Sequence, residues 1–345
     1  NDNNVAPTKE GIDFSHLGIH ISNLEGSNLH YNGIKDITAS FSDFSVTEKS
    51  GFGINQLQTD FALEAQKATL SNLLFKTENG TEIKEYASLS FNSLETIGDD
   101  LNALNFDIQL NNSKIAVNDL FYFSPEQIKN EIISNNKNQI FTINSDIKGN
   151  LKKLQINQLF FSGFRNTRIS INGIMKDVLE IERSYYDLKI NTIHTTESDL
   201  KSMLGAELFP NEITIPKRIT INGSVKGTQK DLASILNINS DLAKGSVSLD
   251  LKNNTHNIQN LKYVATLKLS KIELGKIIQD TAFGAANLDA YIDGQGIDIE
   301  NIESIVRANI SEFTYNRYTY SDLVIDGKLM DKTFMGNASM NDTNL

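Results

Sequence analysis

The chain has 345 residues, of which 39% are hydrophobic and 8% aromatic, and it contains no cysteine and no tryptophan. Its net charge of -11 argues against nucleic acid as a partner, because a phosphate backbone needs a concentrated Lys/Arg surface. The lack of cysteine removes disulfides, thiol chemistry and cysteine-based zinc sites together.

Neither end of the sequence carries a targeting or membrane segment. The first residues, Asn-Asp-Asn-Asn, have neither an initiator Met nor a signal-peptide pattern, and residues 340–345 lack the character of a tail. No run approaches the roughly 18 apolar residues of a transmembrane helix. We therefore expect a soluble piece of a longer polypeptide, with any membrane anchor outside it.

Strict alternation of apolar and polar residues is the dominant signal along the chain. In a strand this pattern places the two classes on opposite faces, and it favours an antiparallel sheet with one wet side over buried parallel strands. The clearest cases are residues 104–110, 168–172, 213–215, 219–222, 247–251 and 265–269. Mainly β structure follows from this pattern.

An Ile-x-Gly element recurs in these strands, and its glycines predict tight bends or bulges where a strand curves or feeds the next. The glycines are Gly149, Gly173, Gly223, Gly294 and Gly327. Their spacing is irregular, so they indicate a recurring hairpin arrangement and not a solenoid of fixed period.

A few short helices interrupt the predicted sheet. Ser124-Pro125 with Gln127 resembles a capping box that starts a helix running to about residue 135. Further helices are predicted from Thr196, over residues 231–236 and over residues 275–283. The Asn-rich stretch 135–138 is the best candidate break, near residue 136, but alternation resumes at Ile140. We expect one continuous segment over residues 1–345.

Candidate catalytic and metal-binding motifs are weak. His16 and His20 would share a helical face, but their neighbours indicate a strand, where residues four apart lie about 13 Å from each other and cannot share one metal. Residues 293–298 resemble half of a calcium repeat, and residues 50–53 resemble part of a phosphate loop, yet both are better explained as turns. Most acidic residues lie on the polar side of strands. We expect no enzyme activity, no metal and no cofactor.

Several strings, in their order, resemble the TamB branch of the AsmA-like envelope proteins. Residues 119–125 (Asp-Leu-Phe-Tyr-Phe-Ser-Pro) are similar to an Asp-Leu-x-Tyr-Phe-x-Pro element ahead of a short helix, and residues 267–276 to a strand leading into Leu-Gly-Lys. The Tyr-rich residues 315–320, the strand 323–329 and the ending 342–345 resemble the family's last motifs. Thr343 departs from the proline of the family's Asp-Pro-Asn-Leu ending.

The resemblance implies an open, U-shaped trough, a long antiparallel β-groove, in a translocation and assembly module protein anchored to the inner membrane and spanning the periplasm. Phospholipid would be its cargo in outer-membrane biogenesis, an Omp85-type β-barrel protein a possible partner, and membrane contact would be made by parts absent from this chain. The residues expected to line the groove share the apolar side of alternating strands. They are Ile169, Ile171, Ile219, Ile221, Val247, Leu249, Leu251, Leu267, Leu269, Leu288, Ile292, Leu323 and Ile325.

Alternatives remain open from the residues alone. The same periodicity would fit a β-sandwich whose apolar faces are closed over each other. A sheet edge could instead serve as a scaffold or chaperone for outer-membrane barrel strands by β-augmentation. A polysaccharide-acting enzyme is a third possibility, and the low aromatic content counts against it.

Overall fold

The chain folds as an antiparallel β-structure with 18 strands in one sheet that is not closed into a barrel. The structure is a computed structural model and describes residues 10–94, 101–180, 183–206, 209, 213–228, 230–252, 260–296, 302–330 and 332–342. Four short α-helices accompany the strands in these ranges. The prediction of a mainly β, open antiparallel fold with a few short helices is confirmed.

Two compact units divide the chain. Unit 1 comprises Asn1–Asn172 and Ser202–Leu204, and unit 2 comprises Gly173–Lys201 and Gly205–Leu345. The Asn-rich stretch 135–138 lies inside unit 1. Consecutive strands pair antiparallel within each unit, as the alternating sequence requires.

Strands β1 to β8 belong to unit 1, and β9 runs across the boundary between the two ranges. Their bounds are β1 (Ile19–Tyr31), β2 (Ile37–Glu48), β3 (Gly53–Glu64), β4 (Lys67–Thr77), β5 (Glu82–Ser90), β6 (Asn105–Ala116), β7 (Ile140–Asn150), β8 (Lys153–Gly163) and β9 (Thr167–Lys176). The strands of unit 2 are β10 (Tyr185–Thr196), β11 (Arg218–Thr228), β12 (Leu232–Ser240), β13 (Lys244–Lys252), β14 (Lys262–Glu273), β15 (Phe283–Gln295), β16 (Glu303–Tyr315), β17 (Tyr318–Met330) and β18 (Thr333–Met340).

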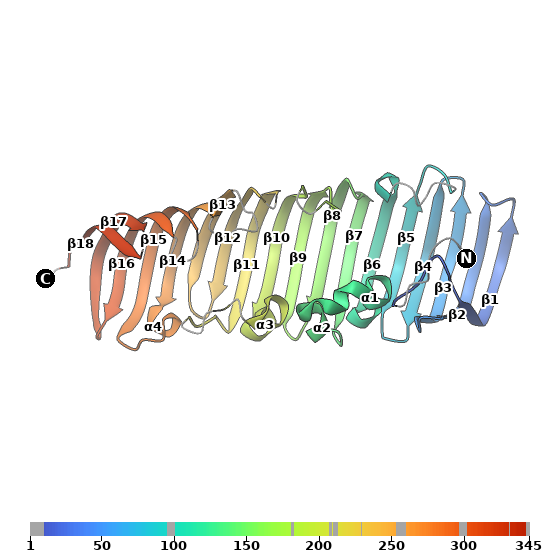
Figure 1. The fold of residues 1–345 in the computed structure, drawn as a ribbon, viewed down its shortest axis with the longest axis horizontal. Helices are drawn as coiled ribbons and strands as arrows, with labels where there is room; N and C mark the ends of the chain where they lie inside the picture. The colour runs from blue at the N-terminus through green and yellow to red at the C-terminus, as the bar shows by residue number, and fades with distance from the viewer. Residues whose placement is uncertain are drawn as a thin grey trace. The chain divides into compact units, whose positions relative to one another are not determined.

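The helices are short and lie at strand ends. In unit 1, α1 (Val117–Phe123), the 3-10 turn η2 (Pro125–Lys129) and α2 (Glu131–Asn135) connect β6 to β7 (Figure 1). A further 3-10 turn, η1 (Leu101–Ala103), precedes β6. Helix α3 (Glu197–Leu204) follows β10 and α4 (Leu274–Ile277) follows β14. No described helix is long and apolar enough to cross a membrane.

The helix predictions met with mixed outcomes. The helix from Thr196 is confirmed, and the Thr196 hydroxyl accepts a hydrogen bond from the Asp199 N–H at 3.3 Å. The capping box at Ser124 is wrong, because Ser124 makes no capping bond and Asn130 instead caps α2 with its side-chain oxygen. The helices predicted over residues 231–236 and 275–283 are wrong in the first case, where β12 begins at Leu232, and too long in the second, where α4 ends at Ile277. Residues 213–215, predicted as strand, lie outside the strands.

Bulges bend the strands and reset their alternation. Asn28, Asn72, Asn112, Lys271 and Asp322 lie inside strands but have positive φ values between 47° and 56°. A residue in this conformation ends the regular ladder for one step and increases the local twist. The N–H of Asn112 is bonded by the Asn144 side chain at 2.7 Å, and that of Lys271 by the Asn287 side chain at 3.0 Å.

The Ile-x-Gly glycines divide into two kinds. Gly149, Gly173 and Gly223 have φ of 118°, 142° and 148°, which only glycine adopts readily, and a side chain at each would meet the backbone of the neighbouring strand. Gly294 and Gly327 have no positive φ. A side chain at Gly294 would instead meet the Ser304 and Tyr263 side chains, and one at Gly327 would meet the Phe334 ring and the Met335 carbonyl.

Candidate functional site

One face of the sheet in unit 2 carries continuous rows of apolar side chains. Residues paired across strands share a face, and so do residues two apart along a strand. One row joins six strands through Leu236, Val247, Leu267, Ala290, Ala308 and Ile325. The adjacent row joins Leu249, Ala265, Ile292 and Val306. We call this surface the apolar face of unit 2.

The opposite face of the same strands is polar. Its central row runs through Ser248, Thr266, Tyr291, Arg307 and Asp326. Arg307 lies over the Tyr291 ring at 6.0 Å and 3.8 Å from the Asp326 carboxylate. A hollow of about 400 Å³ lies at this part of the sheet, and its lining includes Leu267, Ala290, Ala308 and Ile325 of the apolar row together with the residues beside them in each strand.

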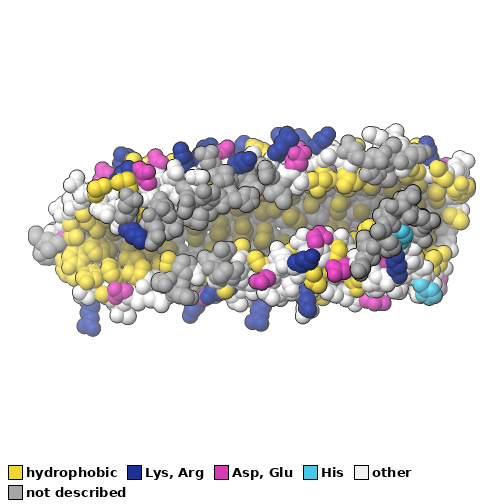
Figure 2. Space-filling view, viewed as in Figure 1, with side chains coloured by type: hydrophobic (Ala, Val, Ile, Leu, Met, Phe, Trp, Pro, Cys, Tyr) yellow, Lys and Arg dark blue, Asp and Glu magenta, His cyan; other side chains and the backbone are white. Residues whose placement is uncertain are grey.

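Unit 1 has an equivalent apolar face. One row joins seven strands through Ala39, Phe61, Leu70, Ala87, Ile108, Ile147 and Ile156. A second row joins Ile37, Leu63, Ala68, Leu89, Phe106, Gly149 and Leu154. In Figure 2, hydrophobic side chains line a hollowed face in each unit, with charged side chains around its rims.

All predicted lining residues from Ile219 onward lie on the apolar face of unit 2, where the register brings them into adjacent rows. Ile169 and Ile171 lie two apart on β9, and Ile169 faces a cavity in unit 1. None of the thirteen predicted residues is buried, and none is fully exposed. Residues sealed inside a sandwich would be buried, so the apolar faces are uncovered in this chain.

The solvent-accessible area agrees with uncovered faces. The chain exposes 20620 Å², whereas a compact monomer of 38.4 kDa exposes about 14,000 Å². The buried hydrophobic residues are few, and many of them are alanines or lie near strand ends. The excess area therefore comes from a sheet with no second layer over its apolar side.

Sequence reasoning missed the apolar face of unit 1 before residue 104. Its strands contain bulges, as between Phe41 and Phe44 in β2 and between Ser71 and Leu73 in β4, and each bulge shifts the alternation by one residue. The signal that could have found it is the density of Phe and Leu in residues 37–91, read with allowance for one-residue slips.

Polar contacts fix the rim of unit 1 where α1 begins. Asp119 is buried and its carboxylate accepts hydrogen bonds from the Thr77 hydroxyl at 2.5 Å and the Asn79 amide at 2.7 Å. These bonds tie α1 to the turn between β4 and β5. Asp119 belongs to the Asp-Leu-x-Tyr-Phe-x-Pro string, and its role here is structural.

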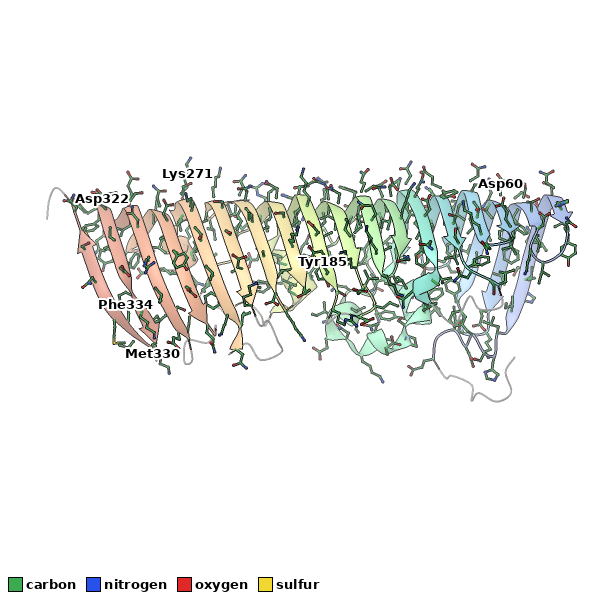
Figure 3. The ribbon with its side chains drawn as sticks, turned by 90° about the horizontal axis from the view of Figure 1, so that it is seen from above. Asp60, Tyr185, Lys271, Asp322, Met330 and Phe334 are labelled. Carbon is green, nitrogen blue, oxygen red and sulfur yellow. The ribbon has the colours of Figure 1, made fainter. Side chains whose placement is uncertain are left out.

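Three carboxylates of unit 1 have pKa values below the ordinary range: Glu48, Asp60 and Glu82, the last through its hydrogen bond and ion pair with Lys84. Burial raises the pKa of Glu48, but hydrogen bonds from the side chain and N–H of Ser50 and the N–H of Gly18 outweigh it. Hydrogen bonds from Asn72 and Ser40 lower the pKa of Asp60 on the outer surface (Figure 3). Fixed donors in turns and ladders hold the Glu48 and Asp60 carboxylates.

Histidines form no metal site among the described residues, which contain no group of three His, Cys, Asp or Glu side chains placed to hold an ion. His20 lies exposed in β1, as predicted. His16 was predicted in a strand but lies in a turn, with its Nδ1 3.0 Å from the Asp13 carboxylate. His194 pairs with the Thr220 hydroxyl at 3.1 Å, and His256 lies outside the described residues.

The predicted turn at residues 50–53 is confirmed, whereas residues 293–295 of the other predicted turn are strand. Residues 50–53 form a turn with Gly51 at φ 92°, so they have no strand–turn–helix phosphate loop. The string 293–298 begins in β15 and continues beyond Gly296 into residues outside the described ranges. The ending 343–345 also lies outside them.

Comparisons of the chain with protein-family models, curated proteins and solved structures find no match.

Proposed function

We propose that this chain is a non-enzymatic lipid-binding protein whose apolar faces shield the acyl chains of phospholipids. The carrying observation is the set of eleven half-buried aliphatic residues, from Ile219 to Ile325, on the apolar face of unit 2, which has no covering layer. The resemblance to TamB-like proteins supports a periplasmic bridge between inner and outer membranes, anchored through parts of the protein outside this chain.

The energetics of lipid movement support such a surface. Moving a chain of about sixteen methylenes through water costs roughly 13 kcal/mol at ~0.8 kcal/mol per methylene, and contact with a continuous apolar face removes much of that cost. The polar opposite face keeps the protein in water. An exposed apolar surface of this extent is otherwise a liability for aggregation, so a ligand that covers it is the simplest reason for its presence.

Native mass spectrometry of the purified chain tests the proposal by detecting co-isolated phospholipid. Leu249→Asp and Leu267→Asp place a charge on the apolar face of unit 2, and each should reduce lipid retention. The matched controls Ser248→Asp and Thr266→Asp change the neighbouring residues on the opposite face and should retain lipid. Absence of lipid from the unmodified protein, or equal retention in all four variants, would contradict the proposal.

A second candidate function is a scaffold that offers a sheet edge to barrel strands of an Omp85-type partner or its clients. All residues of β18 are exposed, including Phe334 at 44% and Met335 at 52%. This candidate predicts that photo-crosslinkers on β18 capture protein, and that the lipid-retention variants above leave this capture unchanged. Capture of lipid alone on β18 would count against it.

A further inference from the structure

A partly open apolar cavity, which we call the roofed cavity, lies between the helices and the strands of unit 1. Its floor is aromatic, because Phe141 of β7 packs against Phe161 and Phe164 with ring centroids 5.0 and 5.3 Å apart. Its roof comes from α1, α2 and the last turn of α3. The roof residues are Val117, Leu120, Ile132, Ile133, Asn136 and Met203, and Ile169 of β9 completes the wall.

The cavity has the size of a ligand site. Its volume is about 370 Å³, whereas an apolar cavity of about 150 Å³ already holds a benzene-sized guest. The register pairs Phe161 with Ile143, and the neighbouring pairs lead to Ile147 and Ile156 on the apolar face of unit 1. A flexible chain lying on that face can therefore continue into the cavity.

The lining selects against polar guests. No charged side chain lines the cavity, and Asn136 is its one polar member. The Asn136 amide nitrogen donates to the Ile132 carbonyl at 2.7 Å and the Ser202 carbonyl at 2.8 Å, so both of its protons are engaged. A headgroup placed here would lose its hydrogen bonds to water without replacement.

We infer that this cavity holds the terminal methyl segment of a single aliphatic chain, while the rest of the lipid lies on the open face. The inference rests on the proposed function, which supplies the lipid. It adds a fixed end point on unit 1, because a chain enclosed by helices on one side and aromatic rings on the other is immobilised in a way the open face does not provide.

The absence of tryptophan allows a clean test with one fluorescent reporter at a time. Phe164→Trp reports on the cavity, and Leu267→Trp reports on the open face of unit 2. The probes are stearic acid and phosphatidylcholine with a nitroxide at carbon 5 or carbon 16 of the chain. We expect a nitroxide at carbon 16 to quench the fluorescence of Phe164→Trp at least twofold more than a nitroxide at carbon 5. At Leu267→Trp, we expect no stronger quenching from carbon 16 than from carbon 5.

The two probes separate a free fatty acid from a phospholipid as the source of the chain. Suppose that Leu267→Trp is quenched, while Phe164→Trp is quenched equally by both nitroxide positions or is not quenched at all. This result would overturn the inference and leave the proposed function standing. Lack of quenching at both reporters would overturn both.

Filling the cavity gives an independent check. Ile169→Phe adds volume from the strand side and Met203→Phe from the helix side, each in the Phe164→Trp background. Either variant that keeps its far-ultraviolet circular dichroism should lose the preference for carbon 16. The same changes in the Leu267→Trp background should leave quenching unchanged. A retained preference in a folded variant would show that the chain end lies elsewhere, and would overturn the inference.

Discussion

At Gly223 the backbone of β11 has a φ of 148°, and a Cβ built there would lie 2.0 Å from the Ile235 carbonyl oxygen. We expect Gly223→Val to cost roughly 2–5 kcal/mol of unfolding free energy, through backbone strain and steric overlap together. Ala233→Val, an exposed change on β12, is the control and should have little effect. Urea unfolding measures both, and equal stabilities would contradict this reading of the glycine.

Asp119 tests the value of a buried carboxylate against an exposed one. Asp119→Ala leaves the Thr77 and Asn79 donors without their acceptor, so a loss of about 1–3 kcal/mol is expected. Asp107→Ala removes a partly exposed ion pair with Lys148 at 3.4 Å and should cost under about 1 kcal/mol. Hydrogen exchange should show faster amides in α1 for Asp119→Ala alone. Comparable losses in the two variants would refute the proposed tie between α1 and the β4–β5 turn.

At the scale of single elements, the bulges explain how straight alternating strands become curved ones. Lys271 and Asp322 lie at the outer bend of β14 and β17 (Figure 3). After the bulge at Lys271 the alternation restarts one residue out of phase, so that Ile272 is buried although Leu269 sets the opposite parity. A bulge therefore bends the strand and also decides which face of the sheet the following side chains occupy.

The bulge in β14 makes a signed prediction. Lys271→Gly removes the strain of a positive φ and should be neutral or stabilising by up to about 1 kcal/mol. Lys268→Gly, in the regular part of the same strand, should cost roughly 0.5–1 kcal/mol. Thermal unfolding of the two variants compares them directly. A larger loss for Lys271→Gly than for Lys268→Gly would mean that the lysine side chain, and not the backbone, stabilises the bend.

The turn held by Glu48 predicts a pH dependence. Glu48 accepts hydrogen bonds from the N–H groups of Gly18 at 3.0 Å and Ser50 at 2.7 Å, and its folded-state pKa is depressed. Its contribution is therefore present above the unfolded pKa of about 4.3 and is lost as pH falls through the folded value. We expect Glu48→Gln to lose roughly 1 kcal/mol at pH 7 and to show a flatter stability profile between pH 5 and 3. Glu64→Gln, an exposed change, should keep the original profile.

Sequence patterns predicted the parts of the fold that obey a fixed period. Unbulged strands such as β11 and β13 were found because two-residue alternation survives along them. β12 was misassigned because Leu232, Ile235 and Leu236 also fit a helical period, and register with β11 and β13 decided the outcome. The roofed cavity could not be predicted, since Phe141, Phe161 and Met203 meet only through tertiary packing.

At the scale of the whole molecule, acidic residues mark every fourth strand. Glu48 ends β2, Asp119 follows β6, Asp199 follows β10, Glu273 ends β14 and Asp342 follows β18. Four of these five are buried, and helices α1, α3 and α4 begin at the middle three positions. A carboxylate thus recurs at the end of β2 and of every fourth strand after it, although acidic residues also end β3 and follow β9 and β12. Glycine spacing did not reveal this recurrence.

The uncovered faces make a thermodynamic prediction for the intact chain. Unfolding exposes less new apolar surface when a face is already wet, so the heat-capacity change should fall below the usual ~12–15 cal/mol/K per residue. Scanning calorimetry of lipid-free protein measures this quantity, and sedimentation at several concentrations checks that the chain is monomeric. A monomer with a heat-capacity change in the usual range would mean that the apolar faces are covered in solution, which would leave no surface for acyl chains.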